Sequence, residues 1–592
     1  MTLASDVESM YSHTVEVYKA LEELHCTMPA QKNLKNIVPT LDTAILYGSI
    51  SYTAEANGRG AVTVYKCKSM SEFLSIIAPA SVSGPTMEHN IGGVTVQRNQ
   101  IVGIVPPVKL TEAPDNFLYF CSYFREEFDV SQLTKVGNNF LAYCPYFNKP
   151  LNFANLTSAG TYFMYLNASW GSVATFNSSV SFPKLQTAGL CFMTNQTKFN
   201  QPINLPVLTS LPAYFLMVDN DAISYASFNN IVTAPKATRA GAYFLRGQIN
   251  FNQPVILPEV TIVDDDFIYM PKAGSTLSKF NSTISLPKAV TIGKYFLVGC
   301  LQYNKDLSLP SATTIDDYFM TADADQETVV AFNSNLSIPK VQTIGNSFLY
   351  CHQKFNKPLD LSNVTSIGTY FMYYYFDGSV PQFNSAITFT KIQTIGNYFL
   401  YDQCSFNKPL NLSTVVTIGD GFLACNLAGG LSSMASPITI TSTCKTIGSS
   451  FLYDQPNFNY PLDLSGVTSL GGFFMPTYHQ TPKFNSTLNL SSCKTIGTTF
   501  MWSQTAFNQN LNLSSLTSID RTFMCNLRSY TSTVTVPSGV SYTADTYTLS
   551  TDLPSAPCYV SGIKIAGAGR AQLMSAFPNG VYGALYRKLV AV

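Results

Sequence analysis

The chain has 592 residues, and 35 acidic residues balance 35 basic ones, so its formal net charge is zero at pH 7. Only 12% of the residues are charged, well below the usual quarter, which argues against nucleic acid as a partner because phosphate binding needs a dense basic surface. No apolar run approaches the roughly 18 residues that a membrane span needs, so we expect no membrane span.

Residues 1–46 are predicted to form a helical docking segment. Ser5 and Glu8 have the spacing of a capping box, and an apolar stripe follows at close to heptad spacing. The stripe needs a partner surface, which is the chain's own next segment, a helical bundle between copies, or a larger assembly. Met1 leads into neither a basic region nor an apolar core, so no secretion signal is expected. The stripe consists of Val7, Met10, Tyr11, Thr14, Val17, Leu21 and Leu24.

Residues 47–110 are predicted to form a small β-rich collar or N-terminal cap. The runs 61–65 and 93–97 alternate like strands, and glycines punctuate them. A cap is needed here because the segment that follows is a repeat, and a stack of repeats exposes apolar surface and unpaired strand edges at its end.

Residues 111–530 are a tandem repeat. The phenylalanine of an Ile-Gly-x-x-Phe-Leu/Met phrase occurs seventeen times from Phe117 to Phe523, mostly at alternating intervals of 23 and 29 residues. A period of this size indicates a solenoid, whose coils must stack to bury their apolar faces. We expect about 17 coils, which at the usual strand spacing extend on the order of 80 Å.

One coil illustrates the predicted local structure. Leu359 and Leu361 alternate as a short strand, while Ile367 and Phe371 are expected to point inward. Gly368 follows Ile367 at a corner that needs either positive φ or a close approach of two backbones.

The repeat phrase resembles the BspA-like class of leucine-rich repeat, with its Ile-Gly corner, inward Phe and strand with a Leu or Ile pair. The resemblance covers roughly residues 111–530, although Asn follows Phe or Tyr where that family more often has Leu-Thr, and every other coil is longer. It implies a mainly β, right-handed parallel β solenoid with few helices, and it implies no particular ligand.

An asparagine follows Phe or Tyr in fourteen of the sixteen intervals between repeat phenylalanines. An amide both donates and accepts, so a column of amides at one corner can pair turn backbone groups that would otherwise be buried without partners. A row of sugar-binding amides is the alternative. The column is Asn148, Asn177, Asn200, Asn229, Asn252, Asn281, Asn304, Asn333, Asn356, Asn384, Asn407, Asn459, Asn485 and Asn508.

The extra residues of the long coils enter between the repeat Phe and the next Phe-Asn, so they are expected to project from one face in every second coil. Insertions on one face are where repeat proteins commonly bind, but sequence drift on a tolerant surface gives the same pattern. Because aromatic side chains give large contact area at low entropy cost, the candidate ligand-binding residues are Trp170, Tyr225, Tyr374 and Tyr478.

Residues 531–592 are predicted to form a C-terminal cap or tip, which is the alternative location for binding. Strands are expected at 531–536 and 547–549, and short helices at 571–577 and 581–589.

The chain shows no motif of catalytic, cofactor or metal chemistry. Its five histidines stand in no metal or nucleophile motif, and no Gly-rich phosphate loop precedes a helix, so we expect neither an enzyme nor a cofactor. The run Asp264 to Asp266 offers oxygen ligands for Ca²⁺ but lacks a known loop spacing, which favours a solvated turn. Several cysteines occupy repeat positions, which favours small buried side chains over zinc ligands; these are Cys121, Cys144, Cys300, Cys351, Cys404, Cys444 and Cys493.

These features lead to the hypothesis of a structural virion protein of a tailed bacteriophage, as a fibre, spike or head decoration. Phage structural proteins assemble in the host cytoplasm without a secretion signal. The N-terminal region is predicted to join other virion proteins in many copies or as a homo-oligomer, and a host protein or glycan is the expected external partner. A cellular BspA-like surface adhesin and an intracellular repeat scaffold are the alternatives.

Overall fold

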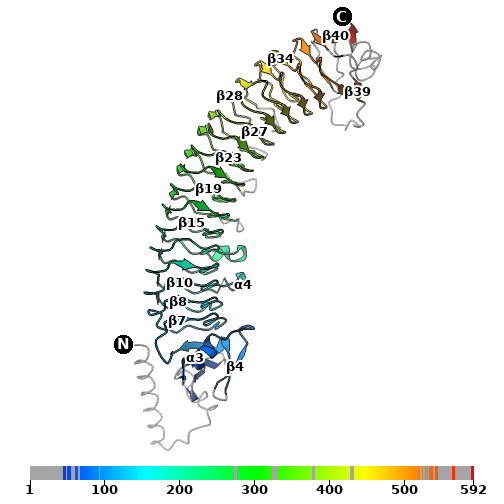
Figure 1. Cartoon of the computed structure of the whole chain (residues 1–592). Coiled ribbons are helices and arrows are strands. Elements are labelled where there is room, and N and C mark those ends of the chain that lie inside the picture. The colour runs from blue at the N-terminus through cyan, green and yellow to red at the C-terminus, as the bar shows by residue number, and fades with distance from the viewer. Residues whose placement is uncertain are drawn as a thin grey trace, which may run out of the picture. The chain divides into compact units, whose positions relative to one another are not determined.

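Two short parallel strands recur in each coil of the repeat. β24 (Leu359–Asp360) pairs in register with β26 (Ile387–Thr388), and β25 (Ser366–Ile367) pairs in register with β27 (Thr394–Ile395). In each dipeptide the apolar residue is buried and the polar residue is at least partly exposed. The repeat is therefore a parallel β solenoid, as predicted, and Figure 1 shows its successive coils.

The computed structural model describes residues 45–47, 50–54, 60–64, 67, 69–91, 94–171, 173–271, 277–322, 330–375, 380–426 and 432–520, and short stretches between 523 and 591. It divides the chain into two compact units, Met1–Leu286 and Pro287–Val592. In the described part of the chain, no helix has the length and apolar character to cross a membrane.

The first unit begins with a small mixed sheet. Its elements before the coils are β1 (Ile45–Tyr47), β2 (Ile50–Ala54), β3 (Gly60–Val64), α3 (Met70–Ile77), β4 (Glu88–Ile91), β5 (Val94–Gln97), η1 (Arg98–Gln100) and β6 (Ile101–Ile104). β1, β2 and β3 pair antiparallel, β6 joins β3 in parallel, and β4 and β5 form an antiparallel hairpin. The two predicted strands of the collar are thus β3 and β5. The predicted N-terminal helix, from the capping residue Ser5 to the end of the apolar stripe at Leu24, lies outside the described residues.

The helix α3 was not predicted from the sequence. Its N-cap is Ser69, whose hydroxyl accepts a hydrogen bond from the backbone N–H of Glu72. The buried Arg98 donates to the carbonyl oxygens of Ile76 and Ile77, where the helix ends, at 3.0 and 3.1 Å. Its Nε donates to the carbonyl of Tyr119 in the first coil. One buried guanidinium therefore caps the helix and ties the collar to the repeat.

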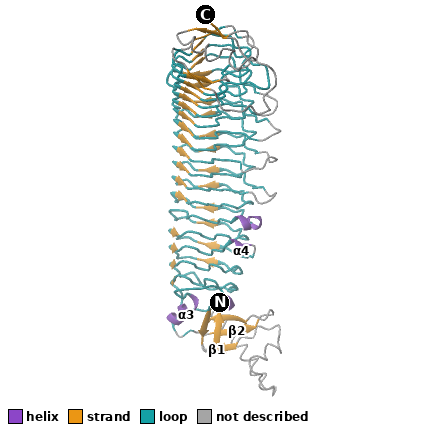
Figure 2. Ribbon diagram, turned by 90° about the vertical axis from the view of Figure 1, so that its right-hand side faces the viewer, coloured by secondary structure: helices purple, strands orange, loops and turns teal. Residues whose placement is uncertain are grey.

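The coils of the first unit add two short helical segments to the strands. Their elements are β7 (Glu112–Ala113), β8 (Lys135–Val136), β9 (Leu151–Asn152), β10 (Ser158–Ala159), α4 (Ala168–Gly171), β11 (Val180–Ser181), β12 (Thr187–Ala188), β13 (Ile203–Asn204), η2 (Asn220–Tyr225), β14 (Val232–Thr233), β15 (Arg239–Ala240), β16 (Val255–Ile256), β17 (Ile262–Val263) and β18 (Ile284–Ser285). α4 and η2 occupy the extra residues of two successive long coils and lie against each other, on one side of the strands in Figure 2.

The second unit repeats the same two strands through its described coils. Its strands are β19 (Thr291–Ile292), β20 (Leu307–Ser308), β21 (Thr314–Ile315), β22 (Leu336–Ser337), β23 (Thr343–Ile344), β24 to β27 as above, β28 (Leu410–Leu412), β29 (Thr417–Ile418), β30 (Ile438–Ile440), β31 (Thr446–Ile447), β32 (Leu462–Asp463), β33 (Ser469–Leu470), β34 (Leu488–Asn489), β35 (Thr495–Ile496), β36 (Leu511–Asn512), β37 (Ser518–Asp520), β38 (Thr533–Thr535), β39 (Ser541–Thr543), β40 (Ile563–Ala566) and β41 (Leu589–Ala591). From β19 to β35 the odd-numbered strands follow one another in a single parallel sheet.

Parallel pairing continues beyond the last repeat phrase. β36, β38, β40 and β41 form one parallel sheet, so the C-terminal segment adds strands to the stack. The predicted strand at 531–536 corresponds to β38. The predicted helix at 581–589 is wrong at Leu589, which belongs to β41, and the rest of that helix and the one at 571–577 lie outside the described residues.

The backbone around the repeat phenylalanine has alternating handedness. Phe371 is fully buried, while Tyr370 and Met372 on either side of it have φ of 59° and 50°. The N–H of Tyr370 donates to the carbonyl of Asn397 in the next coil, and that of Met372 donates to Phe348 in the preceding coil, both at 2.8 Å. Left-handed backbone costs about 1 kcal/mol or more for each such residue, and these hydrogen bonds to both neighbouring coils offset the cost.

The glycine of the repeat phrase meets the second of the two requirements predicted for it. The φ of Gly368 is not positive, but a Cβ placed on it would lie 2.6 Å from the carbonyl carbon of Gly345 in the preceding coil. Ile367, predicted to lie at a corner, instead ends strand β25. Glycine is therefore required because two coil backbones touch directly after the strand.

The core contains two columns of aromatic rings beside its aliphatic side chains. Phe348, Phe371 and Phe399 stack with centroids 5.1 Å apart and nearly parallel planes. The phenylalanines that precede the asparagine column form the second stack, as between Phe355 and Phe383 at 5.9 Å. Each ring contacts its equivalents in the neighbouring coils, so a coil buries its apolar side chains only within the stack.

We predict that Gly368→Ala lowers the thermal midpoint of unfolding, with a loss of about 1–3 kcal/mol, because the new methyl group forces the two backbones apart. Thermal melts monitored by circular dichroism measure the change, with the exposed Lys354→Ala as the control. An unchanged midpoint for Gly368→Ala would show that the coils can separate there without cost.

Candidate functional site

The predicted asparagine column forms hydrogen bonds from coil to coil. The side-chain oxygen of Asn333 accepts the backbone N–H of Asn356 at 2.9 Å, and that of Asn356 accepts the N–H of Asn384 at 2.8 Å. The hydroxyl of Ser385 donates to the same oxygen of Asn356 at 2.9 Å. Each amide oxygen therefore binds the backbone of the following coil.

The same bond recurs in both units at 2.7–3.0 Å. In the first unit the column runs from Asn148 through Asn177, Asn200, Asn229 and Asn252 to Asn281. In the second it runs from Asn304 to the backbone of Ala435, and again from Asn459 through Asn485 and Asn508 to the backbone of Ser532.

The column lies at the surface, which differs from the expectation that it pairs buried groups. Asn148 and Asn356 are exposed, and Asn384 is half-exposed. Water can replace a lost amide there, so each bond contributes close to the net value of an ordinary hydrogen bond, about 0.5–1.5 kcal/mol.

A set of buried glutamines was not predicted from the sequence. The side-chain N–H of Gln403 donates to the carbonyl of Met372 at 2.7 Å, and that of Gln504 donates to Met475 at 2.6 Å. Both acceptors are residues with positive φ that directly follow the repeat Phe. Their carbonyls point into the coil and need a buried donor. The signal in the sequence is a glutamine four residues after the repeat Phe, at Gln196, Gln248, Gln403, Gln455 and Gln504.

The four aromatic residues proposed for ligand binding have different environments. Trp170 lies in α4, and nothing is described of its side chain. Tyr225 ends η2 and is 43% exposed, with the Nζ of Lys198 5.9 Å from its ring centroid. Tyr478 is half-buried and stacks on Tyr453 at 5.3 Å.

Tyr374 does not fit the role proposed for it. Its side chain is fully buried, and its backbone N–H donates to the carbonyl of Tyr401. Its neighbours Tyr373 and Tyr375 are the accessible ones, half-exposed and 63% exposed. The prediction of an exposed anchor at Tyr374 is therefore wrong. The positive φ of Tyr370 and Met372 sets the backbone direction before this segment, and Tyr374 then faces inward.

Six tyrosines of the second unit form a continuous surface, which we name the tyrosine patch. Tyr350, Tyr373 and Tyr401 stack in one column at 5.3 and 5.1 Å, and Tyr370 and Tyr398 stack in a second at 5.1 Å. The columns meet edge to face, as between Tyr370 and Tyr373 at 5.3 Å and 87°. The patch consists of Tyr350, Tyr370, Tyr373, Tyr375, Tyr398 and Tyr401.

The patch is exposed although its rings pack on one another. Tyr370 and Tyr375 are 38% and 63% exposed, and the other four members are half-exposed. At the end of the columns Tyr398 and Tyr401 lean over Gly421, where an added Cβ would lie 2.7 Å from the ring of Tyr398. Because tyrosine is enriched at recognition sites, this surface of ordered aromatic rings is the candidate binding surface.

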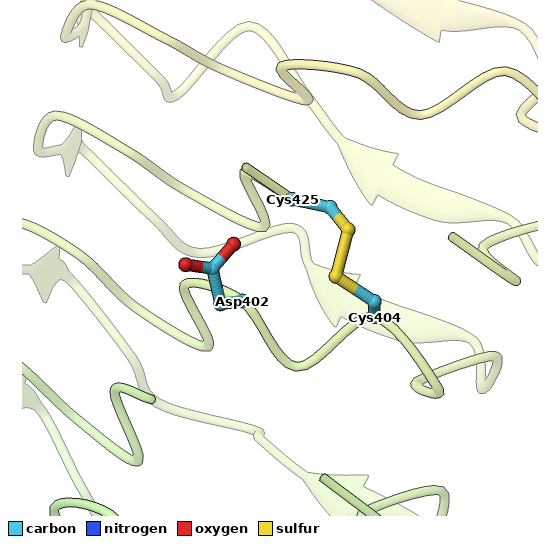
Figure 3. Close-up of side chains that lie close together, drawn as sticks. All are labelled: Asp402, Cys404 and Cys425. Carbon is cyan, nitrogen blue, oxygen red and sulfur yellow. A yellow bond between two sulfur atoms is a disulfide. The ribbon is translucent and has the colours of Figure 1, made fainter. Parts of the chain in front are cut away.

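A disulfide begins three residues after Tyr401 in the chain. Cys404 and Cys425 join two neighbouring coils with a Cα–Cα distance of 5.6 Å, and Figure 3 shows Asp402 beside them. The prediction that Cys404 is a small core side chain is right about burial but missed this bond. Cys121, Cys144, Cys300, Cys351, Cys444 and Cys493 are buried, as predicted, and are not joined in disulfides.

Asp402 and the two sulfurs lie within 4.8 Å of one another and make a group that resembles a metal site. A cystine offers no thiolate, the form of cysteine that binds metal. One carboxylate oxygen of Asp402 already accepts the backbone N–H of Asn426. The arrangement therefore fits a disulfide cross-link between two coils better than a metal centre.

The acidic run at Asp264 is occupied by arginines. Arg239 binds the carboxylate of Asp264 through two hydrogen bonds of 2.7 and 2.8 Å, and Arg246 lies 3.5 Å from Asp266. Two of the three carboxylates of the run therefore face arginines, an arrangement that does not favour Ca²⁺.

Comparison with known proteins found no matching family model and no matching curated protein. Among solved structures, a leucine-rich repeat protein from Bacteroides ovatus ATCC 8483 is 14% identical, with 79% of this chain and 94% of that chain covered and a TM-score of 0.38. A leucine rich cell surface protein from Faecalibacterium prausnitzii A2-165 is 10% identical, with 86% and 97% covered and a TM-score of 0.24. At these values neither carries an argument about function, and the fold rests on the strand pairing described above.

Ala435 stands at the position where the neighbouring coils carry the asparagine of the column. The column can therefore be tested by removing one amide and by adding one. Asn356→Ala should lower the stability by about 0.5–1.5 kcal/mol, and Ala435→Asn should raise it by a similar amount because it supplies the missing acceptor to the next coil. Thermal melts measure both, with Lys354→Ala as the control. Opposite shifts are expected, and two variants that melt like the parent would show that the column has no stabilising role.

The disulfide should stabilise the second unit by about 2–4 kcal/mol through the loop it closes. We expect a reductant to lower the melting midpoint of the parent protein and to leave Cys404→Ala/Cys425→Ala unaffected. Thiol titration under the same conditions verifies that the bond has been reduced. If the reduced parent melts like the oxidised one, the bond makes no contribution.

Proposed function

We propose that this protein is a non-enzymatic recognition protein, whose solenoid presents the tyrosine patch to a partner surface. The observation that carries this proposal is the ordered, exposed arrangement of Tyr370, Tyr373 and Tyr375 with their neighbours. Stacking holds the rings in place before a partner arrives, so binding costs little side-chain entropy.

The solenoid itself supports a role in display. Phenylalanines stack at its inward positions, and backbone hydrogen bonds join neighbouring coils at its corners. A cavity next to His352 encloses only about 10 Å³, room for roughly one water molecule. Burial lowers the pKa of His352 to about 4, so this side chain is neutral and suits a structural place in the core.

For the biological setting we propose a structural virion protein of a tailed bacteriophage, attached through its N-terminal region, with the patch directed toward the host. A surface adhesin of a cell is the alternative setting. The low charge of the chain and its regular polar surface suit both, and detection of the protein in purified particles or on intact cells distinguishes them.

A double variant tests the recognition role. Tyr370→Ser and Tyr373→Ala place in the patch residues that the repeat already has at equivalent positions, Ser347 with φ 59° and Ala424. The variant should therefore fold while losing most of the attachment, about tenfold or more. Attachment of labelled protein is measured on cells of the bacterium that the phage infects or that carries the gene.

Tyr460→Ser serves as the matched control, because Tyr460 is 38% exposed, as Tyr370 is, but lies outside the patch. It should attach like the parent protein. Parental attachment by the double variant would move recognition away from the patch, to the long-coil segments or to the C-terminal segment at 531–592.

A further inference from the structure

The tyrosine patch presents no formal charge to a partner. Burial raises the pKa of Tyr350 and Tyr401 to about 12 and raises that of Tyr373 as well, so their hydroxyl groups stay protonated at physiological pH. Among the described residues, the charged group that acts on Tyr373 and Tyr401 is Asp402, which is buried. Phosphate, sulfate and strongly charged protein surfaces therefore gain no ion pair here.

The contacts that the patch offers repeat at the spacing of the coils. Ring centroids follow one another at 5.3 and 5.1 Å from Tyr350 through Tyr373 to Tyr401, and at 5.1 Å from Tyr370 to Tyr398. An extended peptide presents side chains on one side roughly every 6.6 Å. It would fall out of register with the rings within three coils.

The exposed rims of the rings carry hydroxyl groups. An apolar helix laid on the patch would bury these hydroxyls without partners, at a cost of about 1–3 kcal/mol for each one. A pyranose chain has apolar C–H faces for the rings and hydroxyl groups of its own for the phenols. The length of one sugar unit along the chain is similar to the distance between equivalent rings of successive coils.

We propose that the tyrosine patch binds an extended, uncharged glycan that runs along the coils, with successive sugar units against successive coils. This inference rests on the proposed recognition function and specifies its ligand. Tyr373 is central because its ring contacts those of Tyr350, Tyr370, Tyr375, Tyr398 and Tyr401.

Titration calorimetry with the full chain tests the inference. The probes are cellohexaose, chitohexaose and maltohexaose, the trisaccharide of each, and a hexamer of galacturonate as the charged comparison. We expect at least one neutral hexasaccharide to bind, its trisaccharide to bind about tenfold more weakly, and low and high salt to give affinities within roughly twofold. Affinity should also stay constant between pH 6 and about pH 9, because burial raises the pKa of Tyr350, Tyr373 and Tyr401.

The Tyr370→Ser/Tyr373→Ala variant should bind the active hexasaccharide about tenfold or more weakly, and Tyr460→Ser should bind it like the parent. The inference is overturned if no neutral hexasaccharide binds, if the double variant binds one like the parent, or if the galacturonate hexamer binds best with a steep salt dependence.

Cell attachment separates this inference from the proposed function. If the double variant loses attachment but the neutral hexasaccharides neither bind nor compete, the patch recognises a protein and only the glycan is excluded. If the double variant attaches like the parent, the recognition role of the patch fails as well.

Discussion

The alternating handedness of the backbone at the repeat phenylalanine is the constraint on which the rest of the solenoid depends. Residues with positive φ on both sides of Phe371 turn one N–H toward the next coil and one toward the preceding coil. The corner is thereby hydrogen-bonded in both directions, and its phenylalanine is fixed inward. The same geometry directs Tyr370 and Tyr373 outward, so the core and the tyrosine patch have one origin in the backbone.

Stacking of equivalent residues also explains why so few residues are charged. A side chain in this fold lies about 5 Å from its counterpart in the next coil, and like charges at that distance repel. Asparagine avoids the repulsion because its oxygen accepts from the next backbone N–H, as Asn356 does from Asn384. Tyrosine avoids it by stacking. The low content of charged residues, which suits a neutral ligand, is thus also what the stacked architecture requires.

Periodicity made much of the fold predictable. The repeat of Ile-Gly-x-x-Phe, the inward Phe371 and the strand at Leu359 follow from one-dimensional spacing, because each coil meets the same environment. The asparagine column was predicted for the same reason, but its exposure to solvent was not predicted. The sequence also led to the expectation of a glycine with either positive φ or a close backbone approach, but not to the left-handed residues beside the phenylalanine.

The sequence by itself determined a stack of coils, their inward side chains and their ladder of amides, because these recur at fixed intervals. Only the tertiary structure decided which outward residues meet. After the corner at Phe371, Tyr374 is buried, Tyr373 is half-exposed and Tyr375 is exposed. Neighbouring coils bring together residues some 20 to 30 positions apart, such as Cys404 and Cys425. Such contacts are set by coil length and backbone handedness, which no local pattern specifies.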